Sequence, residues 1–301
     1  MENNTILKQG LREITEQEVT HIQEVVSLFP KLSRKELART LCEHLSWCSP
    51  SGAPKLSGCL TLLERLEAQS LLVLPKKSAR IRLSPDKPPQ LTPRTEQRAL
   101  LKGALKAFVP ITLDLLHDKE SVQLFNEYLH RYHPLSYRRP FGHWLRYFLM
   151  SESEPLGCLL ISGAAKSLHH RDHWISWDLA QRRRNLSWVI NNNRYLIFPW
   201  VEIPHLASHA LGQLSRRVAT DWEERWGYRP VLMETFVDPA LYSGTCYKAA
   251  GWQNLGLTTG EGHYRSGKHY SSTPKHIFVK PLTQHFRTLL CSEQLQGRHI
   301  E

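Results

Sequence analysis

Residues 191–262 decide the fold: NNNRYLIFPWVEIPHLASHALGQLSRRVATDWEERWGYRPVLMETFVDPALYSGTCYKAAGWQNLGLTTGEG. The periodicity of the apolar residues changes several times along this stretch. In order, it predicts a strand over Arg194–Ile203, a helix over His205–Trp226, a strand over Val231–Val237, a short helix over Tyr242–Ala250 and an extended segment over Trp252–Thr259. Strands that alternate with helices are typical of an α/β layer, so we expect this stretch to form the centre of a sheet covered by helices.

The long helix is predicted from apolar residues at steps of three and four. These are Leu206, Ala210, Leu211, Leu214, Val218 and Trp222. Residues at this spacing lie on one face of a helix, and that face is expected to pack on the sheet.

One short segment resembles the GNAT acyltransferases. Residues 247–252, YKAAGW, are similar to the Tyr-x-Lys-x-Gly-Phe-like signature of that fold. The resemblance implies a GNAT-like mixed sheet, acetyl coenzyme A as the acyl donor and Tyr247 as the acid that protonates the departing thiolate. Backbone amides at a helix start hold the pyrophosphate in that fold, and glycines allow its close approach. Residues 204–209, PHLASH, contain no glycine, so the sequence disfavours a coenzyme A site.

A second resemblance covers nearly the whole chain. Five motifs occur in the order seen in the A component of the Druantia anti-phage defence system: Ser176–Asp178, Asn192–Leu196, Leu206–His209, Glu234–Asp238 and Gly244–Ala250. The domain of that family also occurs in proteins of insertion sequences. The resemblance therefore implies a role on DNA, in host defence or as a mobile-element accessory, beside a partner such as a helicase or transposase of the same locus.

The N-terminal part has a different pattern. Helices are predicted over residues 16–29, after an N-cap at Ser33, and over Ser57–Gln69. Extended runs over Leu71–Leu74 and Ala79–Leu83 would follow as a hairpin, which makes this part resemble a winged helix. The alternative is a three-helix module for packing or dimerisation.

Four prolines in residues 84–94 disfavour both helix and sheet and mark a linker. We therefore predict an α+β protein with a winged-helix-like domain at 1–84, a linker at 85–95 and a GNAT-like α/β domain at 96–301. In the last domain we expect helices over Thr95–Ala107, Glu120–Tyr132 and Asp178–Ile190, a hairpin of Trp144–Met150 with Leu156–Ala164, and a last strand over His276–Val279.

The net charge of +11 favours a nucleic-acid partner, because clustered lysine and arginine attract backbone phosphate. A basic surface that is merely solvated is the alternative. The residues predicted to contact nucleic acid are Lys55, Lys76, Lys77, Arg80, Arg82, Arg138, Arg139, Arg182, Arg183, Arg184, Asn193 and Arg194. The first reading is thus a protein that recognises a DNA structure or end and acts with partners.

A nuclease or nickase is the second reading. Glu234 and Asp238 lie four apart in an extended run, so with His209 they could hold Mg²⁺ or Mn²⁺ and orient water at a phosphate. A buried strand rarely carries a carboxylate without a partner, so a structural ion pair of Glu234 with Arg194 or Arg229 is the alternative. A GNAT-type acyltransferase with Tyr247 as acid is the third reading.

The cysteine spacing disfavours a structural zinc site and a disulfide scaffold. The six cysteines are far apart and form no Cys-x-x-Cys pair, which indicates reduced thiols in a cytoplasmic protein. The histidine-rich run at 169–173 is interpreted as solvated. No signal peptide and no apolar run of bilayer length occur, so we expect no membrane contact. Assembly into a homo-oligomer is left open.

Overall fold

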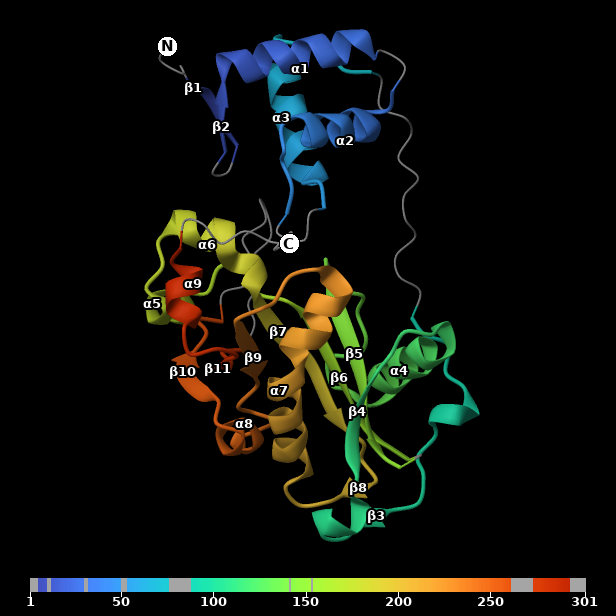
Figure 1. Cartoon of the computed structure of the whole chain (residues 1–301). Coiled ribbons are helices and arrows are strands. Elements are labelled where there is room, and N and C mark those ends of the chain that lie inside the picture. The colour runs from blue at the N-terminus through green and yellow to red at the C-terminus, as the bar shows by residue number, and fades with distance from the viewer. Residues whose placement is uncertain are drawn as a thin grey trace. The chain divides into compact units, whose positions relative to one another are not determined.

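The structure is a computed structural model that describes residues 5–9, 12–29, 32–49, 53–75, 88–140, 142–152, 154–260 and 273–292. The described residues form two compact units, one within residues 1–83 and the other within residues 84–293. Each unit has a core of its own and is described by itself. Together they make a mixed α+β protein (Figure 1).

The smaller unit joins a β-hairpin to three helices. Its elements are β1 (Thr5–Gln9), β2 (Arg12–Thr15), α1 (Glu16–Leu28), α2 (Arg34–His44) and α3 (Leu56–Ala68). Capping boxes start α1 at Thr15 and α2 at Ser33, as the sequence around Ser33 predicts. The predicted cap of α3 at Ser57 is wrong, since α3 begins at Leu56 after Lys55.

The predicted wing is not confirmed. The hairpin of this unit precedes the helices instead of following them, and Leu71–Leu74 forms no strand. The amide of Leu74 instead donates to Glu67 Oε1 at 3.1 Å, and Glu67 is paired with Arg34 at 2.9 Å. This described segment is thus fastened to the helices and is not a strand. Residues 79–83 lie outside the described ranges.

The larger unit is built on a seven-stranded sheet in the order β10-β11-β9-β7-β6-β5-β4 (Figure 1). The strands are β4 (Ile111–Leu115), β5 (Trp144–Ser151), β6 (Glu154–Gly163), β7 (Val189–Ile197), β9 (Leu232–Val237), β10 (Gln253–Leu257) and β11 (His276–Pro281). Neighbours are antiparallel except β7 and β9, which are parallel. A short parallel pair, β3 (Leu101–Lys102) with β8 (Val201–Glu202), lies apart from the sheet.

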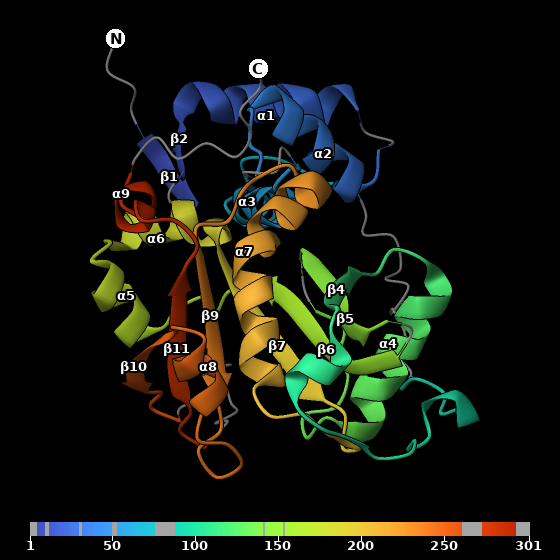
Figure 2. The same ribbon diagram turned by 60° about the horizontal axis from the view of Figure 1, so that its bottom comes forward.

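Helices cover both faces of this sheet. They are α4 (Lys119–Tyr132), α5 (His169–Ile175), α6 (Leu179–Asn185), α7 (Leu206–Trp226), α8 (Thr245–Ala249) and α9 (Phe286–Leu290). Two adjacent residues of β5 show that α4 and α7 lie on opposite faces. Tyr147 donates to Asp221 of α7 at 2.8 Å, whereas the Phe148 ring packs on Phe125 of α4 at 5.7 Å. Figure 2 shows α7 crossing its face of the sheet.

The long helix follows the sequence prediction. All six residues of the predicted apolar stripe are buried in α7, and Gly227 ends the helix in the left-handed conformation at φ 77°. The hairpin of β5 and β6 and the strands β9 and β11 also lie where the sequence predicts them.

One predicted helix is wrong and another is shorter than predicted. Residues 95–107 contain two short 3₁₀ turns, η1 (Pro93–Thr95) and η2 (Leu105–Phe108), and no α-helix. The amide of Leu101 donates to the carbonyl of Trp200 at 2.8 Å, so β8 takes the hydrogen bond that a helix would make within itself. The helix predicted over Asp178–Ile190 ends at Asn185, and a 3₁₀ turn, η3 (Leu186–Trp188), leads into β7. Within the described residues, no helix is both long and apolar enough to span a bilayer.

Candidate functional site

The parallel strands β7 and β9 separate soon after they meet. They pair only between Val189–Asn191 and Leu232–Glu234. Beyond these residues, the two strands line a cavity of about 500 Å³, the splay cavity, through Asn192, Asn193, Tyr195, Leu196 and Ile197 of β7 and Thr235–Val237 of β9. A gap at the carboxyl ends of parallel strands is where α/β sheets commonly bind ligands.

A β-bulge in β7 sets which side chains reach this gap. Leu160 of β6 pairs with Arg194 and the next residue, Ile161, pairs with Asn192, so Asn193 is the extra residue. Because of the bulge, Asn192 faces the side of the sheet that holds α7 and α8. Arg194 faces the opposite side, on which α4 lies.

The wall of the splay cavity combines amides, hydroxyls and aromatic rings. Its residues are His133, Pro134, Leu135, Asn192, Asn193, Tyr195, Leu196, Ile197, Ala207, Thr235, Phe236, Val237, Asp238, Leu241, Tyr242, Ser243, Gly244, Thr245, Cys246, Tyr247 and Lys275. The Asn192 amide donates to the Tyr247 hydroxyl at 3.0 Å, and the Thr235 hydroxyl donates to the Asn192 carbonyl at 2.9 Å. The side-chain oxygen of Asn192 is buried and has no partner within the described chain. Its capacity to accept a hydrogen bond is therefore unfilled by the described chain.

Tyr247, the acid that the GNAT resemblance implies, lies in the wall of the splay cavity. Its ring is almost fully buried against Trp252 and Phe278. Burial raises the pKa of the Tyr247 phenol, so the hydroxyl stays protonated at neutral pH. It can therefore donate a hydrogen bond into the cavity.

A basic groove adjoins the splay cavity. It has a volume of about 890 Å³, and we call it the arginine groove; its residues are Pro88, Pro89, His130, Pro134, Leu135, Ser136, Tyr137, Arg138, Arg139 and Arg194. The Arg194 Nε donates to the Ser136 carbonyl at 3.1 Å. No Asp or Glu lines the groove, and within the described chain none of its three arginines forms an ion pair.

No described acidic side chain in the wall of this groove balances the positive charge of its three arginines. Burial lowers the pKa of the Arg194 guanidinium, and the positive charge of Arg138 lowers it further. Arginine nonetheless stays protonated in proteins, so the groove keeps its positive charge. Guanidinium groups held in this way suit the oxygens of a phosphate.

The two hollows share a wall. Pro134 and Leu135 line both. Beside them, His133 accepts a hydrogen bond from the Leu135 amide on Nδ1 at 3.1 Å. Burial lowers the pKa of His133 to about 4, with a contribution from the Arg194 charge, so the ring is neutral at physiological pH.

The other residues predicted to contact nucleic acid are dispersed. Arg182 is paired with Asp172 at 2.8 Å, and Arg184 is exposed on α6. Lys55 is exposed ahead of α3 in the smaller unit. The side chain of Arg183 lies outside the part of the chain that the structure describes. The same holds for the four predicted wing residues, Lys76, Lys77, Arg80 and Arg82. Asn193 joins the arginines, since its side-chain oxygen accepts from Arg194 at 2.7 Å.

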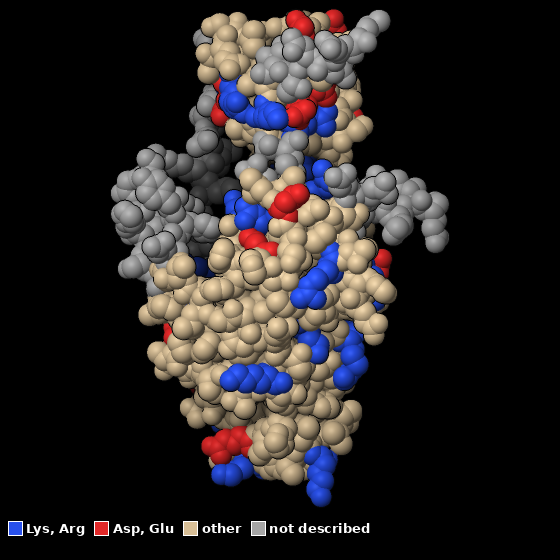
Figure 3. Space-filling view, turned by 90° about the vertical axis from the view of Figure 1, so that its left-hand side faces the viewer, with Lys and Arg blue, Asp and Glu red and all other residues tan. Residues whose placement is uncertain are grey.

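On the face shown in Figure 3, the lysines and arginines of the larger unit do not gather into one patch that would mark an interface. The basic side chains of the larger unit are scattered singly over that face. The arginine groove is distinguished by its concave wall and by the absence of described carboxylates, and not by the number of its charges.

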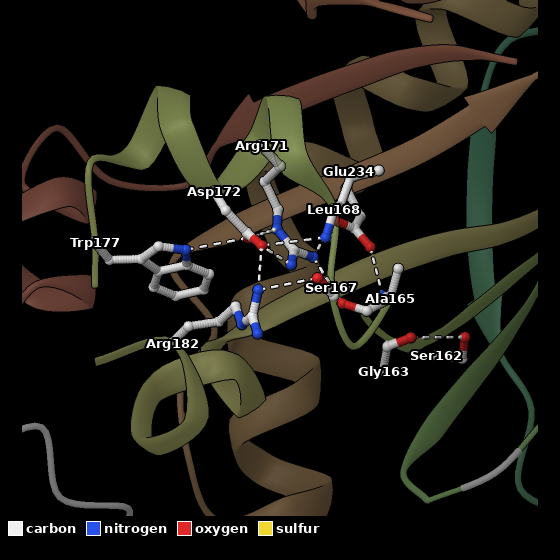
Figure 4. Close-up of polar contacts among 10 residues, drawn as sticks. All are labelled: Ser162, Gly163, Ala165, Ser167, Leu168, Arg171, Asp172, Trp177, Arg182 and Glu234. Atoms are coloured by element: carbon white, nitrogen blue, oxygen red, sulfur yellow. Dashed lines mark hydrogen bonds and ion pairs between the residues drawn. The ribbon is translucent and has the colours of Figure 1, made fainter. Parts of the chain in front are cut away.

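Glu234 lies in a buried ion-pair network (Figure 4). Its Oε2 contacts Arg171 Nη1 at 2.7 Å, and its Oε1 accepts from the Ala165 amide at 2.7 Å. Both charged side chains of the pair are 0% exposed. Arg171 also contacts Asp172 at 2.7 Å, and Asp172 accepts from the indole of Trp177 at 3.1 Å. The network fastens α5 to the sheet.

Electrostatics in this network favour the paired state. Burial raises the pKa of Glu234, and Arg171 opposes that rise. Burial would lower the pKa of Arg171, but the charges of Glu234 and Asp172 raise it overall. The expected ion pair of Glu234 with an arginine is confirmed, but the partner is Arg171. Arg194 faces the arginine groove, and Arg229 is paired with Glu223.

The structure does not bring the predicted nuclease residues into one site. Asp238 follows β9 and lines the splay cavity, where it accepts from Thr273 at 3.1 Å. His209 does not line that cavity; its ring contacts Gln213, whose amide donates to the Ile111 carbonyl of β4. Within the described ranges, no three His, Cys, Asp or Glu side chains are close enough to hold a metal ion.

The sequence interpretation missed Arg171. The run at 169–173 was interpreted as solvated, and its three histidines are indeed exposed, but Arg171 among them is fully buried. The signal was available in Glu234, a carboxylate within an apolar strand, because such a group requires a cationic partner somewhere in the chain.

Together, the sheet and its two hollows define the class of protein: a mixed α+β protein whose central parallel strands open onto a ligand-sized cavity beside a basic groove. The family described as Druantia protein DruA matches residues 66–275. The chain belongs to this DruA family, a component of Druantia anti-phage defence.

Solved structures with a similar sheet are acyltransferases. One is the aminoglycoside acetyltransferase AAC(6')-Ib in complex with coenzyme A and kanamycin, at 16% identity and a TM-score of 0.37, over 57% of this chain and 94% of that one. The others are a Bacillus subtilis acetyltransferase in complex with CoA (9%, TM-score 0.32, 57% and 99%) and FeeM, an N-acyl amino acid synthase from uncultured soil microbes (15%, TM-score 0.36, 57% and 90%). At TM-scores below 0.5, nothing about activity follows. No curated protein matches the chain.

Proposed function

We propose that this protein binds DNA through the arginine groove and acts there with other proteins of the Druantia system. The observation that carries the proposal is the convergence of Arg138, Arg139 and Arg194 on one groove without a described carboxylate. The three residues come from two separate parts of the chain, and the part-buried hydrogen bonds of Arg194 to two backbone carbonyls fix its position. Positioned guanidinium groups with no counter-charge suit a row of backbone phosphates.

The alternatives have less support. In the nuclease reading, the fully buried contact of Glu234 with Arg171 uses the carboxylate that would hold a metal. In the acyltransferase reading, Tyr247 lies in a suitable cavity, but the segment that leads into α7, residues 204–209, contains no glycine. Contact of the smaller unit with DNA through its helices, as a winged-helix module, also stays a prediction.

Matched variants test the proposal. Labelled single-stranded and duplex DNA would be titrated with the wild type, with Arg138→Gln/Arg139→Gln, and with the control Arg216→Gln/Arg225→Gln, which removes two exposed arginine charges outside the groove. We expect the groove variant to weaken binding at least tenfold and the control to change it less than threefold. Equal weakening by both variants, or no binding by the wild type, would refute the proposal. Running the samples with Mg²⁺ or Mn²⁺ on denaturing gels tests cleavage in the same experiment.

A further inference from the structure

The arginine groove and the splay cavity meet at adjacent residues of one strand. Arg194 lines the groove, and its neighbour Asn193 lines the cavity. The two side chains also contact each other, since Asn193 Oδ1 accepts from Arg194 Nη1 at 2.7 Å. A chain of phosphates along the arginines would therefore pass directly over the entrance to a cavity that is not itself lined by arginine.

The chemistry of the cavity differs from that of the groove. Its wall holds one described carboxylate and one lysine among amides, hydroxyls and rings. The buried side-chain oxygen of Asn192 has no described hydrogen-bond partner, and the amide nitrogen of the same side chain donates to the Tyr247 hydroxyl. Tyr242 and Leu241 are 59% and 56% exposed, and both belong to the cavity wall. Apolar faces and hydrogen-bonding edges together are the surface of a nucleobase.

We propose that the splay cavity takes the base of one unpaired nucleotide of DNA whose flanking phosphates lie in the arginine groove. This inference rests on the proposed DNA binding. A base within a duplex is stacked and paired, so it must be unpaired or turned out of the helix to enter. The occupant contacts the Asn192 edge through a hydrogen-bond donor such as an exocyclic amine and stacks on Tyr242.

The test compares two duplexes that differ by one nucleotide. One is fully paired, and the other carries a single extrahelical 2-aminopurine at its centre. We expect the full-length protein to bind the second at least tenfold more tightly, with a change in 2-aminopurine fluorescence as the base leaves water. Equal affinity for the two duplexes with unchanged fluorescence would overturn the inference and leave the proposed DNA binding in place.

Variants locate the effect. Tyr242→Ala removes the exposed ring, and Ala207→Leu narrows the cavity. Both are expected to abolish the preference for the unpaired base and to keep the affinity for paired duplex. The control is Leu179→Ala, an apolar residue 52% exposed on α6 and outside the cavity wall, which is expected to keep the preference.

The two proposals fail differently. Arg138→Gln/Arg139→Gln is expected to weaken both duplexes, whereas the cavity variants weaken only the one with the unpaired base. A Tyr242→Ala protein that loses affinity for both duplexes equally would contradict a role in holding the base. A wild-type protein that binds neither duplex would refute the DNA-binding proposal itself.

Discussion

Glu234 and Arg171 form a fully buried ion pair, in which each side chain compensates the charge of the other. Replacing Glu234 by alanine leaves the fully buried Arg171 with Asp172 as its remaining carboxylate partner. We expect Glu234→Ala to lower the free energy of unfolding by about 3–5 kcal/mol, the cost of breaking a buried pair, measured by urea denaturation.

The matched control is the exposed pair of Arg229 and Glu223, whose side chains are 53% and 46% exposed. Glu223→Ala is expected to change stability by less than about 1 kcal/mol. A Glu234→Ala protein of wild-type stability that had lost metal-dependent DNA cleavage would contradict the structural role and support the nuclease reading.

His133 makes stability depend on pH. Its pKa is about 4 in the folded protein and 6.5 ordinarily, so the unfolded chain binds a proton that the folded one does not between these values. The stabilising contribution is full above pH 6.5 and is lost as the pH falls towards 4, by about 3 kcal/mol at most. Protonation of Nδ1 would also remove the hydrogen bond from the Leu135 amide.

His133→Asn tests this, because an amide oxygen can replace Nδ1 as acceptor. His143 has a lowered pKa as well and acts in the same direction, so the informative quantity is the difference between wild type and variant. We expect the melting temperature of the variant to fall less steeply than that of the wild type as the pH is lowered from 6.5 to 4. Parallel curves would show that His133 does not titrate in this range.

At the scale of elements, α8 depends on the glycine before it. Gly244 has φ 70°, and a Cβ added there would lie 2.6 Å from the Phe278 ring. Left-handed backbone and overpacking each cost about 1–3 kcal/mol, so Gly244→Ala should destabilise the protein by about 2–4 kcal/mol.

Gly163→Ala is the control for this prediction. Gly163 ends β6, and nothing lies within 4 Å of the Cβ that alanine would add. Its expected effect is below about 0.5 kcal/mol in the same denaturation experiment. If both variants unfolded at the wild-type urea midpoint, the conformation of Gly244 would not be required for the fold.

Elements with a complete local signal were predictable from the sequence. The apolar stripe of α7, the capping box at Ser33 and the polar turn between β5 and β6 each specify their element within a few residues. The helix predicted over 95–107 does not form, because a hydrogen bond to a residue far away in the sequence replaces one that the helix would need. The hydrogen bond from Leu101 goes to Trp200, about a hundred residues along the chain, and no local pattern records it.

The candidate site was predictable only in part. Arg138, Arg139 and Arg194 were identified by charge, but their meeting joins parts of the chain that are far apart in sequence, which no local pattern signals. The four-residue spacing of Glu234 and Asp238 suggested a shared face. In the structure, Glu234 points to α5 within the strand, whereas Asp238 lies beyond the end of β9.

At the scale of the whole molecule, the arginine groove predicts a modest salt dependence. Three arginines that each neutralise one phosphate release about 0.7–0.9 counterions apiece, so the slope of log K against log salt should be about −2 to −3. Fluorescence anisotropy over a range of salt concentrations measures it. Arg138→Gln/Arg139→Gln should leave a slope shallower by about 1.5, whereas a slope unchanged in that variant would place the phosphates elsewhere.

The early end of the β7–β9 ladder has a consequence for the backbone itself. Between Asn192–Ile197 and Thr235–Val237, the amides that do not point to β6 or β11 point to the splay cavity and have no strand partner. In deuterium oxide these amides should exchange their hydrogens well before the amides in the rest of the sheet, which are held in the strand ladders. Any molecule that fills the splay cavity would slow the exchange of these amides. Deuterium uptake therefore reports whether the cavity is occupied, even when the ligand is not identified.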